Sequence, residues 1–441
     1  MVKDPLSRRR FLKAAGLAAG SLVTPVSRGH SEGHRRPKVA AIFTVFTYRS
    51  HAHVILENFL EEYLFNGKRT DPGVDLVSFY ADQTPGGDMS RRVSREYGIP
   101  IFESIDEALC LGGRELAVDA VLSIGEHGSY PRNELGQVEY PRKRFFDEIV
   151  GTMKRSGRFV PMFNDKHLSY QWSLAKEMYD ETVQHGIPLL AGSSVPLAQR
   201  LPPLELPRGA EFEEAVSIHG GPLESYDFHG LEVLQSMVES RRGGESGVSS
   251  VAFVSGDEVW RAAEEGRFSL ELANAAMTAE FGRPLKTLTK IDGERDVTPH
   301  CLLLRYKDGF RAAVLKIGRS DKRWNFACRL KRSPAIHATS FRVGPWNNRC
   351  LFKALSHAIQ HHFVYGKAPY PPERTLLATG VLEASMKSRS QSGETIATPH
   401  LEFDYDCPDF TRMRESGASW KILKEDTPQP HGIHSSFSEN P

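Results

Sequence analysis

Two side chains in this sequence, Lys166 and His229, are suited to proton-transfer chemistry. An imidazole has an ordinary pKa close to neutrality, so His229 can accept or donate a proton under mild conditions. The ammonium group of Lys166 can polarise a carbonyl or hydroxyl oxygen. The alternative is that His229 is a packed or capping histidine and that Lys166 is a surface charge at the end of a strand.

Other histidines and carboxylates stand where buried strands are expected to end. They are His51 and His53, Glu126 and His127, and Asp165 and His167. Ligands bind at the carboxyl ends of the strands in an open parallel sheet, so these side chains are expected at a cleft. Imidazoles and carboxylates also bind metals, but the chain has no H-E-x-x-H pattern or comparable spacing. Polar residues at the rim of a cleft are favoured, and no metal site is predicted.

The elements that would position these residues follow from the hydrophobic pattern. Residues 39–43 form a continuous apolar run, which is typical of a strand buried on both faces of a parallel sheet. Further runs alternate with helical patterns, and the expected strands are residues 39–43, 74–80, 99–102, 117–124, 159–163 and 187–190. This alternation predicts an α/β fold with a Rossmann-type, doubly wound parallel sheet over residues 37–196.

The second half of the chain has a different rhythm. Its expected strands are residues 215–219, 249–254, 298–306 and 310–317, and its expected helices are residues 228–238, 350–365 and 376–388. The last two strands are joined by Lys307-Asp-Gly, a hairpin signal. We predict a C-terminal α+β domain with an open mixed or antiparallel sheet over residues 197–410. Residues 411–441 are expected to be an extension that is poorly ordered after Trp420.

The N-terminus carries a specific short signal. Residues 7–13, S-R-R-R-F-L-K, precede a mild apolar run over residues 14–23. That run is too short to span a bilayer as a stable helix, so it predicts an export signal. The paired arginines resemble the signal of the twin-arginine pathway, which carries folded proteins. We expect residues 1–36 to be export signal and linker, and the mature chain to be exported, periplasmic or extracytoplasmic, with no membrane span.

Net charge and cysteine content limit the classes of partner and metal site that the sequence predicts. A formal net charge of +1 over 441 residues gives no reason to expect nucleic acid or a membrane surface as partner. The five cysteines are Cys110, Cys301, Cys328, Cys350 and Cys407. They are odd in number and contain no C-x-x-C pair, so buried free thiols are expected rather than a disulfide framework or a zinc motif.

Several segments, taken in order, resemble the glucose–fructose oxidoreductase/inositol dehydrogenase/MocA family over about residues 38–405. The matching stretches are residues 98–102 (G-I-P-I-F), 104–108 (S-I-D-E-A), 366–374 and 398–401 (T-P-H-L). The family pairs a Rossmann domain with a C-terminal α/β domain whose sheet covers the active site. Most members act on sugars or polyols with NAD or NADP, so the resemblance implies a small carbohydrate substrate and that cofactor.

The resemblance also assigns roles near Lys166 and His229. Asp165 and Lys166 stand where the family has Glu-Lys-Pro, whose lysine contacts cofactor and substrate. Residues 220–232 resemble the family's histidine motif, in which His229 matches the acid/base histidine and Glu232 the acid after it. The carboxylate four residues before the histidine is replaced by Ser225. On this basis we interpret Lys166, His229 and Glu232 as catalytic.

The dinucleotide-binding loop departs from the family. Its fingerprint glycines permit a tight turn, a close approach of backbone to pyrophosphate, and close helix–strand packing. Thr44, Phe46 and Arg49 stand at those positions, so β-carbons and a phenyl ring would crowd a pyrophosphate, although Arg49 could pair with a phosphate. Asp82 ends the second strand, where family members bind the adenosine ribose. The predicted cofactor-binding residues are Thr44, Phe46, Arg49, Asp82 and Glu126.

Three functions stay open at this point. The first is an exported, divergent oxidoreductase acting on a sugar or sugar derivative, in which bound NAD(P) takes a hydride. His229 would then remove the hydroxyl proton while Lys166 steadies the alkoxide. The second is a non-redox lyase or hydrolase of keto-sugars on the same scaffold, and the third is a catalytically silent carbohydrate-binding protein. A homo-oligomer is left open in each case.

Overall fold

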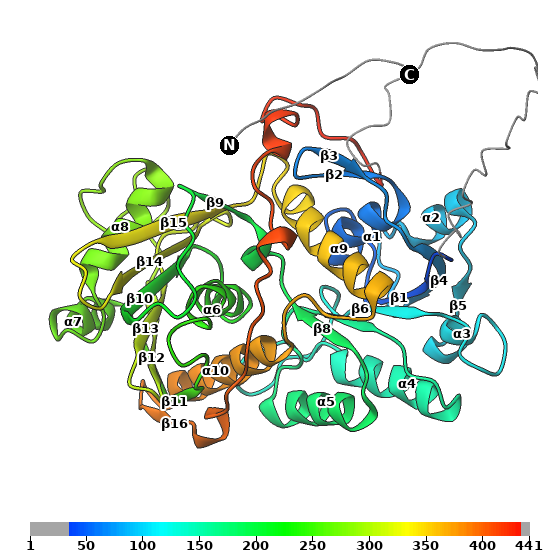
Figure 1. Ribbon diagram of the computed structural model, residues 1–441, viewed down its shortest axis with the longest axis horizontal. Helices are drawn as coiled ribbons and strands as arrows, with labels where there is room; N and C mark the ends of the chain where they lie inside the picture. The colour runs from blue at the N-terminus through cyan, green and yellow to red at the C-terminus, as the bar shows by residue number, and fades with distance from the viewer. Residues whose placement is uncertain (1–34, 434–441) are drawn as a thin grey trace, which may run out of the picture. The chain divides into compact units, whose positions relative to one another are not determined.

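The computed structural model describes residues 35–433, so the predicted export signal lies outside the described residues. The first sheet is parallel and contains β1 (Lys38–Phe43), β4 (Asp75–Ala81), β5 (Ile101–Phe102), β6 (Ala120–Ile124), β7 (Met162–Asp165) and β8 (Leu189–Gly192). Its strand order is β5-β4-β1-β6-β7-β8 (Figure 1). This is the doubly wound order, which reverses direction between β1 and β6 and leaves a crevice there. The predicted Rossmann-type sheet is therefore confirmed.

Helices cover both faces of this sheet because β1 is apolar on both sides. Val39, Ala41 and Phe43 pack in one apolar cluster with α1 (His51–Leu60). Ala40 and Ile42 belong to a second cluster with the other layer of helices. That layer consists of α3 (Ile105–Cys110), α4 (Arg142–Arg155) and α5 (Trp172–His185), and α2 (Ser90–Tyr97) follows β4. An uninterrupted apolar strand is thus explained by burial on both faces.

The second sheet has eight strands and is mixed. Its order is β16 (Ile396–Ala397), β11 (Val248–Ser255), β12 (His300–Tyr306), β13 (Arg311–Lys316), β10 (Phe212–His219), β14 (Trp324–Leu330), β15 (Ile336–Arg342) and β9 (Gln199–Leu201). β10 pairs with β13 in parallel, and the other neighbouring strands of this sheet pair antiparallel. The predicted mixed C-terminal sheet is confirmed.

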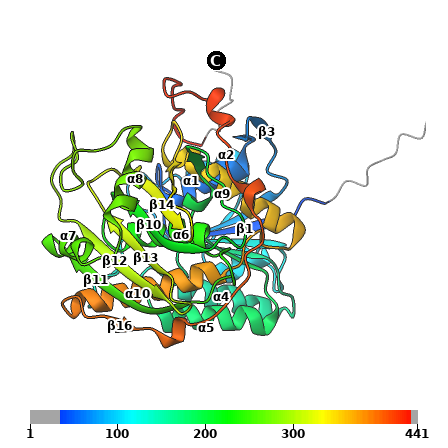
Figure 2. The ribbon, with the colours of Figure 1, turned by 60° about the vertical axis from the view of Figure 1, so that its left-hand side comes forward.

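Helices also lie on both faces of the second sheet. α7 (Asp257–Glu264) and α8 (Leu270–Phe281) pack on one face (Figure 2). α6 (Ser225–Val238) and α10 (Glu373–Ser390) pack on the other. α6 therefore runs between the second sheet and the elements of the first half, which puts its N-terminus beside the crevice of the parallel sheet.

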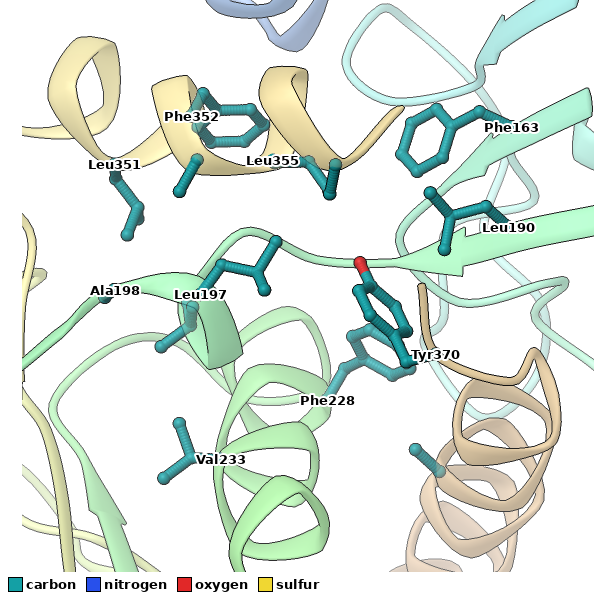
Figure 3. Packing of buried hydrophobic residues seen from close by; sticks show 14 of the residues in the cluster. Phe163, Leu190, Leu197, Ala198, Phe228, Val233, Leu351, Phe352, Leu355 and Tyr370 are labelled. Carbon is teal, nitrogen blue, oxygen red and sulfur yellow. The ribbon is translucent and has the colours of Figure 1, made fainter. Parts of the chain in front are cut away.

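The two halves are joined by a shared apolar core. α9 (Asn348–Tyr365) follows the second sheet in sequence but packs on α1. Figure 3 shows Phe352 and Leu355 of α9 in the same cluster as Phe228 of α6 and Leu190 of β8. Residues 36–433 belong to one compact unit, and the predicted boundary between residues 196 and 197 stays a prediction.

The C-terminal segment corrects one expectation. Residues 411–433 pack against the body of the protein and include two short 3-10 turns, η3 (Thr411–Met413) and η4 (Ser419–Lys421) (Figure 1). The indole N–H of Trp346 donates to the carbonyl oxygen of Thr427 at 3.0 Å, and Ile433 is fully buried. The prediction of a poorly ordered extension after Trp420 is therefore wrong as far as residue 433, since apolar burial and backbone hydrogen bonds hold it.

Other described features bear on the remaining expectations. All five cysteines are buried free thiols, as predicted. Within residues 35–433, no helix combines the length and the apolar character needed to cross a bilayer. A small hairpin, β2 (Tyr63–Phe65) and β3 (Lys68–Thr70), was not expected from the sequence.

Candidate active site

A cavity of about 440 Å³ lies where β1, β6 and β7 end and α6 begins. Its polar lining includes His51, Glu126, His127, Lys166, Glu224 and His229. Aromatic side chains from α6, β14 and α9, namely Tyr226, Trp324 and Phe352, form part of its wall. Flat apolar faces beside a few convergent polar groups suit a small polar ring compound.

Lys166 is the cation of a buried ion-pair chain. Its ammonium group donates to Glu126 Oε1 at 2.8 Å, and Arg142 donates to the second oxygen of the same carboxylate. Burial alone would raise the pKa of Glu126, but Lys166 and Arg142 hold it well below its usual range. Lys166 has a positive φ of 58°, at the point where β7 turns into the cavity wall. The structure thus puts Lys166 and Glu126 side by side in the cavity.

His229 lies on the first turns of α6 with its ring against the cavity. The ring packs edge-on to Trp324, with 5.2 Å between centroids, and Nδ1 has no hydrogen-bond partner among the described residues. Burial lowers the pKa of His229 well below its ordinary value, and the charge of Lys166 lowers it further. The imidazole is therefore neutral and able to accept a proton.

Glu232 does not lie with Lys166 and His229. It is buried behind the cavity, where its carboxylate accepts from the amide of Ser193 at 2.8 Å and from the Thr375 hydroxyl at 3.3 Å. A β-carbon on Gly192 would come within 2.6 Å of its Oε1, so this carboxylate fits tightly against the end of β8. Glu232 has the contacts of a residue that fixes α6 against β8, and its predicted catalytic role has no support from a place in the cavity.

His51, at the start of α1, and His127, after β6, also line the cavity. His51 Nδ1 lies 2.6 Å from Asp165 Oδ2, and its ring packs against His127 at 4.9 Å. Burial lowers the pKa of His127 to about 4, with a further contribution from His51. His53, which the sequence grouped with them, is turned away from the cavity and contacts Gly432 instead.

Sequence reasoning missed one cavity residue, Glu224. It is the N-cap of α6 and forms a capping box with Asp227. The Glu224 side chain accepts from the Asp227 amide, and the Glu224 amide donates to Asp227 Oδ2 at 2.6 Å. Burial raises the pKa of Glu224 to about 7. The spacing of an acid three residues before Asp227 at a helix start is a readable signal for such a box.

Comparison with known proteins gives the fold a name. No family model and no curated protein sequence matches the chain. Among solved structures it is similar to myo-inositol dehydrogenase from Lactobacillus casei in complex with NAD(H) and myo-inositol, with 12% identity, a TM-score of 0.51, and coverage of 85% of this chain and 99% of that one. The chain has the fold of the glucose–fructose oxidoreductase/inositol dehydrogenase/MocA family.

Two further similar structures agree. Apo scyllo-inositol dehydrogenase from Lactobacillus casei is 10% identical, with a TM-score of 0.50, over 82% of this chain and 98% of that one. A myo-inositol dehydrogenase from Corynebacterium glutamicum ATCC 13032 is 12% identical, with a TM-score of 0.50 and the same coverage. Identity this low establishes the glucose–fructose oxidoreductase/inositol dehydrogenase/MocA fold and not a reaction.

The loop that carries the family's glycine fingerprint is built differently here. Thr44 and Phe46 are fully buried. The Thr44 hydroxyl donates to the carbonyl oxygen of Glu126 at 2.5 Å, and the Phe46 ring packs edge-on to Phe43 at 5.4 Å. The Phe46 amide donates to Asp88 at 3.2 Å. Thr44 and Phe46 are therefore part of the core and offer nothing to a cofactor.

The amides at the start of α1 have partners within the chain. The Arg49 amide donates to His53 Nδ1 at 2.7 Å, the Ser50 amide to Thr47, and the His51 amide lies 3.4 Å from His127 Nδ1. The Arg49 guanidinium donates to Gln429 Oε1 at 2.8 Å. A helix N-terminus binds phosphate through amides without intrahelical partners, and here the amides of Arg49, Ser50 and His51 are already paired.

Asp82 is also engaged. It accepts from the Tyr130 hydroxyl at 2.7 Å, from the Tyr80 hydroxyl at 2.9 Å, and from Arg144. Beside it, Gln83 and the backbone of Ser129 exchange two hydrogen bonds of 2.9 Å. The segment after β6 thus covers the place where the family binds an adenosine ribose. We call the region formed by residues 44–50, 53, 82–83 and 128–130 the closed groove, and its residues do not fit an NAD or NADP molecule bound as the family binds it.

One cluster in the described part of the chain has ligand atoms close enough to share a metal ion, and it consists of His219, Asp227 and His300. Its atoms are paired with each other, since both histidine Nε2 atoms lie within 2.9 Å of Asp227 Oδ1. Burial opposes ionisation of Asp227, but the two histidines hold its pKa below its ordinary value. The cluster lies outside the cavity lining, and its contacts fix Asp227 beneath Glu224.

Proposed function

We propose that the chain is an enzyme that acts on a sugar-type substrate by proton transfer, without a bound dinucleotide. One observation carries this proposal. The Arg49 amide and the Asp82 carboxylate, which lie where this fold binds a dinucleotide, are paired inside the chain in the closed groove, whereas a neutral His229 and the cation of Lys166 line the cavity beside it. The similar structures, inositol dehydrogenases, support a ring compound with several hydroxyl groups as the substrate class.

The chemistry that suits this pair is elimination from a keto-sugar glycoside. His229 removes the proton from the carbon that lies between the carbonyl carbon and the anomeric carbon. The released electron pair forms an enolate, whose oxygen Lys166 stabilises. The electrons then re-form the carbonyl and a carbon–carbon double bond while the glycosidic C–O bond breaks. The leaving oxygen takes up one proton, and His229 holds the proton that the sugar carbon has lost. The products are an unsaturated keto-sugar and an alcohol, so no electrons are gained or lost overall and no oxidant is required.

The electrostatics of the cavity support these roles. A base must be unprotonated to act, and burial beside Lys166 keeps the pKa of His229 well below its ordinary value. The stabilising cation must remain in place as the enolate forms, and Lys166 is anchored by Glu126 at 2.8 Å. Both groups are held before substrate arrives, which is what electrostatic stabilisation of a developing charge needs.

The test uses purified protein and methyl 3-keto-glucoside with no added cofactor. Methanol release and the absorbance of the unsaturated ketone are measured together. We expect turnover in the wild type, a decrease of at least about a hundredfold in His229→Ala, and no change in His400→Ala, whose histidine is exposed. Turnover that survives in His229→Ala would remove His229 from the mechanism. NAD or NADP released from the denatured protein in equimolar amount, with hydride transfer to it, would establish a dehydrogenase instead.

We also propose that the chain is exported in folded form by the twin-arginine pathway. The support is the S-R-R-R-F-L-K sequence at residues 7–13 and the short apolar run after it. Replacing Arg8 and Arg9 together by lysine is expected to leave the protein in the cytoplasm, as measured by cell fractionation. Arg28→Lys, outside the motif, is the matched control. Export of the double variant at the wild-type level would contradict the proposal.

A further inference from the structure

An alkoxide is a poor leaving group, so the elimination proposed above needs an acid as well as a base. We propose that Glu224 is the second catalytic residue, and that its carboxylic acid protonates the glycosidic oxygen as the C–O bond breaks. This inference rests on the proposed function. It adds the substrate class that such an acid serves, namely keto-glycosides whose leaving group is an ordinary alcohol.

Glu224 and His229 reach the cavity from one element. Both residues lie at the start of α6, both line the cavity, and they are 8% and 7% exposed. Glu224 Oε1 lies 3.5 Å from Nε2 of His167, which is itself buried. One short stretch of chain therefore presents an acid and a base to the same space, which is the arrangement that an elimination across two neighbouring atoms requires.

The backbone holds Glu224 in an uncommon conformation. Its φ of 69° and ψ of −69° are rare for a residue with a β-carbon. Asp227 supports this conformation by accepting from the Glu224 amide at 2.6 Å, and His219 and His300 in turn fix Asp227. Strained residues persist where the surrounding structure over-determines them, and they gather at active sites. The buried side chains of Asp227, His219 and His300 thus hold Glu224 at the cavity.

Burial and charge together decide the protonation state of Glu224. The groups that act on it are Lys166 and Arg142, which favour the carboxylate, and Glu126 and Asp227, which favour the acid. Burial is the largest influence, and it raises the pKa of Glu224 to about 7. His167 also lies beside it, and Asp321 and Lys322 line the same cavity after β13.

The pKa values of His229 and Glu224 are therefore shifted in opposite directions. Burial lowers the pKa of the imidazole, so that it is a free base, and raises the pKa of the carboxyl group, so that a large share is a free acid near pH 7. In the reaction His229 gains the proton that the sugar carbon loses, and Glu224 gives its proton to the leaving oxygen. The site ends with an imidazolium and a carboxylate, and exchange of one proton between them through solvent restores it.

The experiment compares two leaving groups. Methyl 3-keto-glucoside needs an acid, whereas nitrophenyl 3-keto-glucoside releases a stable phenolate without one. In Glu224→Gln we expect release of methanol to fall by about a hundred- to a thousandfold, and release of nitrophenol to stay within about fivefold, since no proton transfer to that leaving group is required. Exchange of the sugar C–H proton in heavy water should persist in Glu224→Gln and be lost in His229→Ala. Glu134→Gln, at an exposed position after β6, is the control and should match the wild type.

A second measurement needs no variant. Turnover of the methyl substrate by the wild type should fall as the pH rises through about 7, where Glu224 loses its proton, and turnover of the nitrophenyl substrate should not. Equal losses on both substrates in Glu224→Gln, or equal pH profiles in the wild type, would overturn the role of Glu224 while leaving the proposed function in place. Absence of both C–H exchange and alcohol release in the wild type would overturn the proposed function, and this inference with it.

Discussion

The closed groove and the cavity are adjacent parts of one crevice, yet the chain treats their polar groups in opposite ways. In the closed groove the Arg49 amide and the Asp82 carboxylate both have partners within the protein. In the cavity, His229 Nδ1, His167 Nδ1 and Trp324 Nε1 are buried and have no partner among the described residues.

This difference says more about function than the fold does. Buried polar groups in proteins are almost always hydrogen-bonded, so a group of unpaired ones marks a place where a ligand or water belongs. Both regions occupy positions that bind ligands in a doubly wound fold. The two regions differ in the hydrogen bonding of individual atoms. The polar atoms of the closed groove are paired within the protein, and several polar atoms of the cavity are not.

The largest effect on turnover is expected when the ammonium group of Lys166 is removed from the cavity. Lys166→Ala should lower turnover of a keto-glycoside by about a hundred- to a thousandfold, because the enolate loses its stabilising charge. Glu126 keeps its ion pair with Arg142, so the melting temperature should change little. Initial rates and thermal melts measure both quantities, with Lys176→Ala on α5 as the control, since Lys176 pairs only with its neighbour Asp180. A loss below tenfold would break the distinction between an active cavity and a closed groove.

Protonation of His53 at acidic pH should break the hydrogen bond that its Nδ1 accepts in the closed groove and lower the unfolding free energy. His53 donates through Nε2 to Gly432 and accepts the Arg49 amide at Nδ1, and burial lowers its pKa from 6.5 to about 4. The unfolded chain therefore takes up this proton first, so the stability from His53 is complete above pH 6.5 and is lost as the pH falls toward 4. The loss is about 3 kcal/mol of unfolding free energy.

The test compares urea unfolding of the wild type and His53→Gln between pH 7 and pH 4. The unfolding free energy of the variant should decrease less steeply, because the contribution of His53 is gone. Some decrease should remain, because the pKa values of His127, His357 and His362 are also lowered. Identical slopes for the two proteins would show that the closed groove does not depend on a neutral His53.

Removing a buried side chain from the C-terminal segment sharpens the comparison further. Ile433→Ala should cost about 2 kcal/mol of unfolding free energy, because Ile433 is fully buried in the core that includes α1. Ile422, which is 52% exposed in the same segment, is the matched control, and Ile422→Ala should cost less than about 0.5 kcal/mol. Equal costs in chemical denaturation would mean that the segment contributes no specific packing.

The smallest effect is expected at Asp82. Tyr130→Phe removes one hydrogen bond to this carboxylate and should cost about 1 kcal/mol. No affinity for NADH should appear in fluorescence titration, because Tyr80 and Arg144 still engage Asp82. Tyr365→Phe is the control, since that side chain is 69% exposed. Tight NADH binding by Tyr130→Phe would show that a single contact closes the groove.

Much of the fold was predictable because its signals are local. β1 and β6 are apolar runs, since both of their faces are covered. β14 was missed because its sequence, W-N-F-A-C-R-L, neither alternates nor stays apolar. Its buried Asn325 donates to Glu280 of α8 at 2.6 Å, a contact that no local pattern reports.

The site was predictable only in part, for the same reason. The family resemblance, together with residue type, indicated Lys166 and His229, and the bulk of Phe46 counted against a pyrophosphate. The pairing that closes the groove joins residues far apart in the chain, such as Arg49 and Gln429, and no local pattern reports it. Glu224 was missed because its protonation depends on burial, which only the folded structure defines.

The attachment of residues 427–433 to α1 has a consequence for synthesis of the protein. These residues leave the ribosome after every strand of both sheets, yet they supply the carbonyl oxygen for His53 and a buried isoleucine beside the first helix. Folding that proceeds from the N-terminus during translation cannot complete the surroundings of α1 until this late segment arrives. A nascent chain interrupted before residue 427 would keep an apolar gap at α1, which is the kind of surface that chaperones and proteases bind.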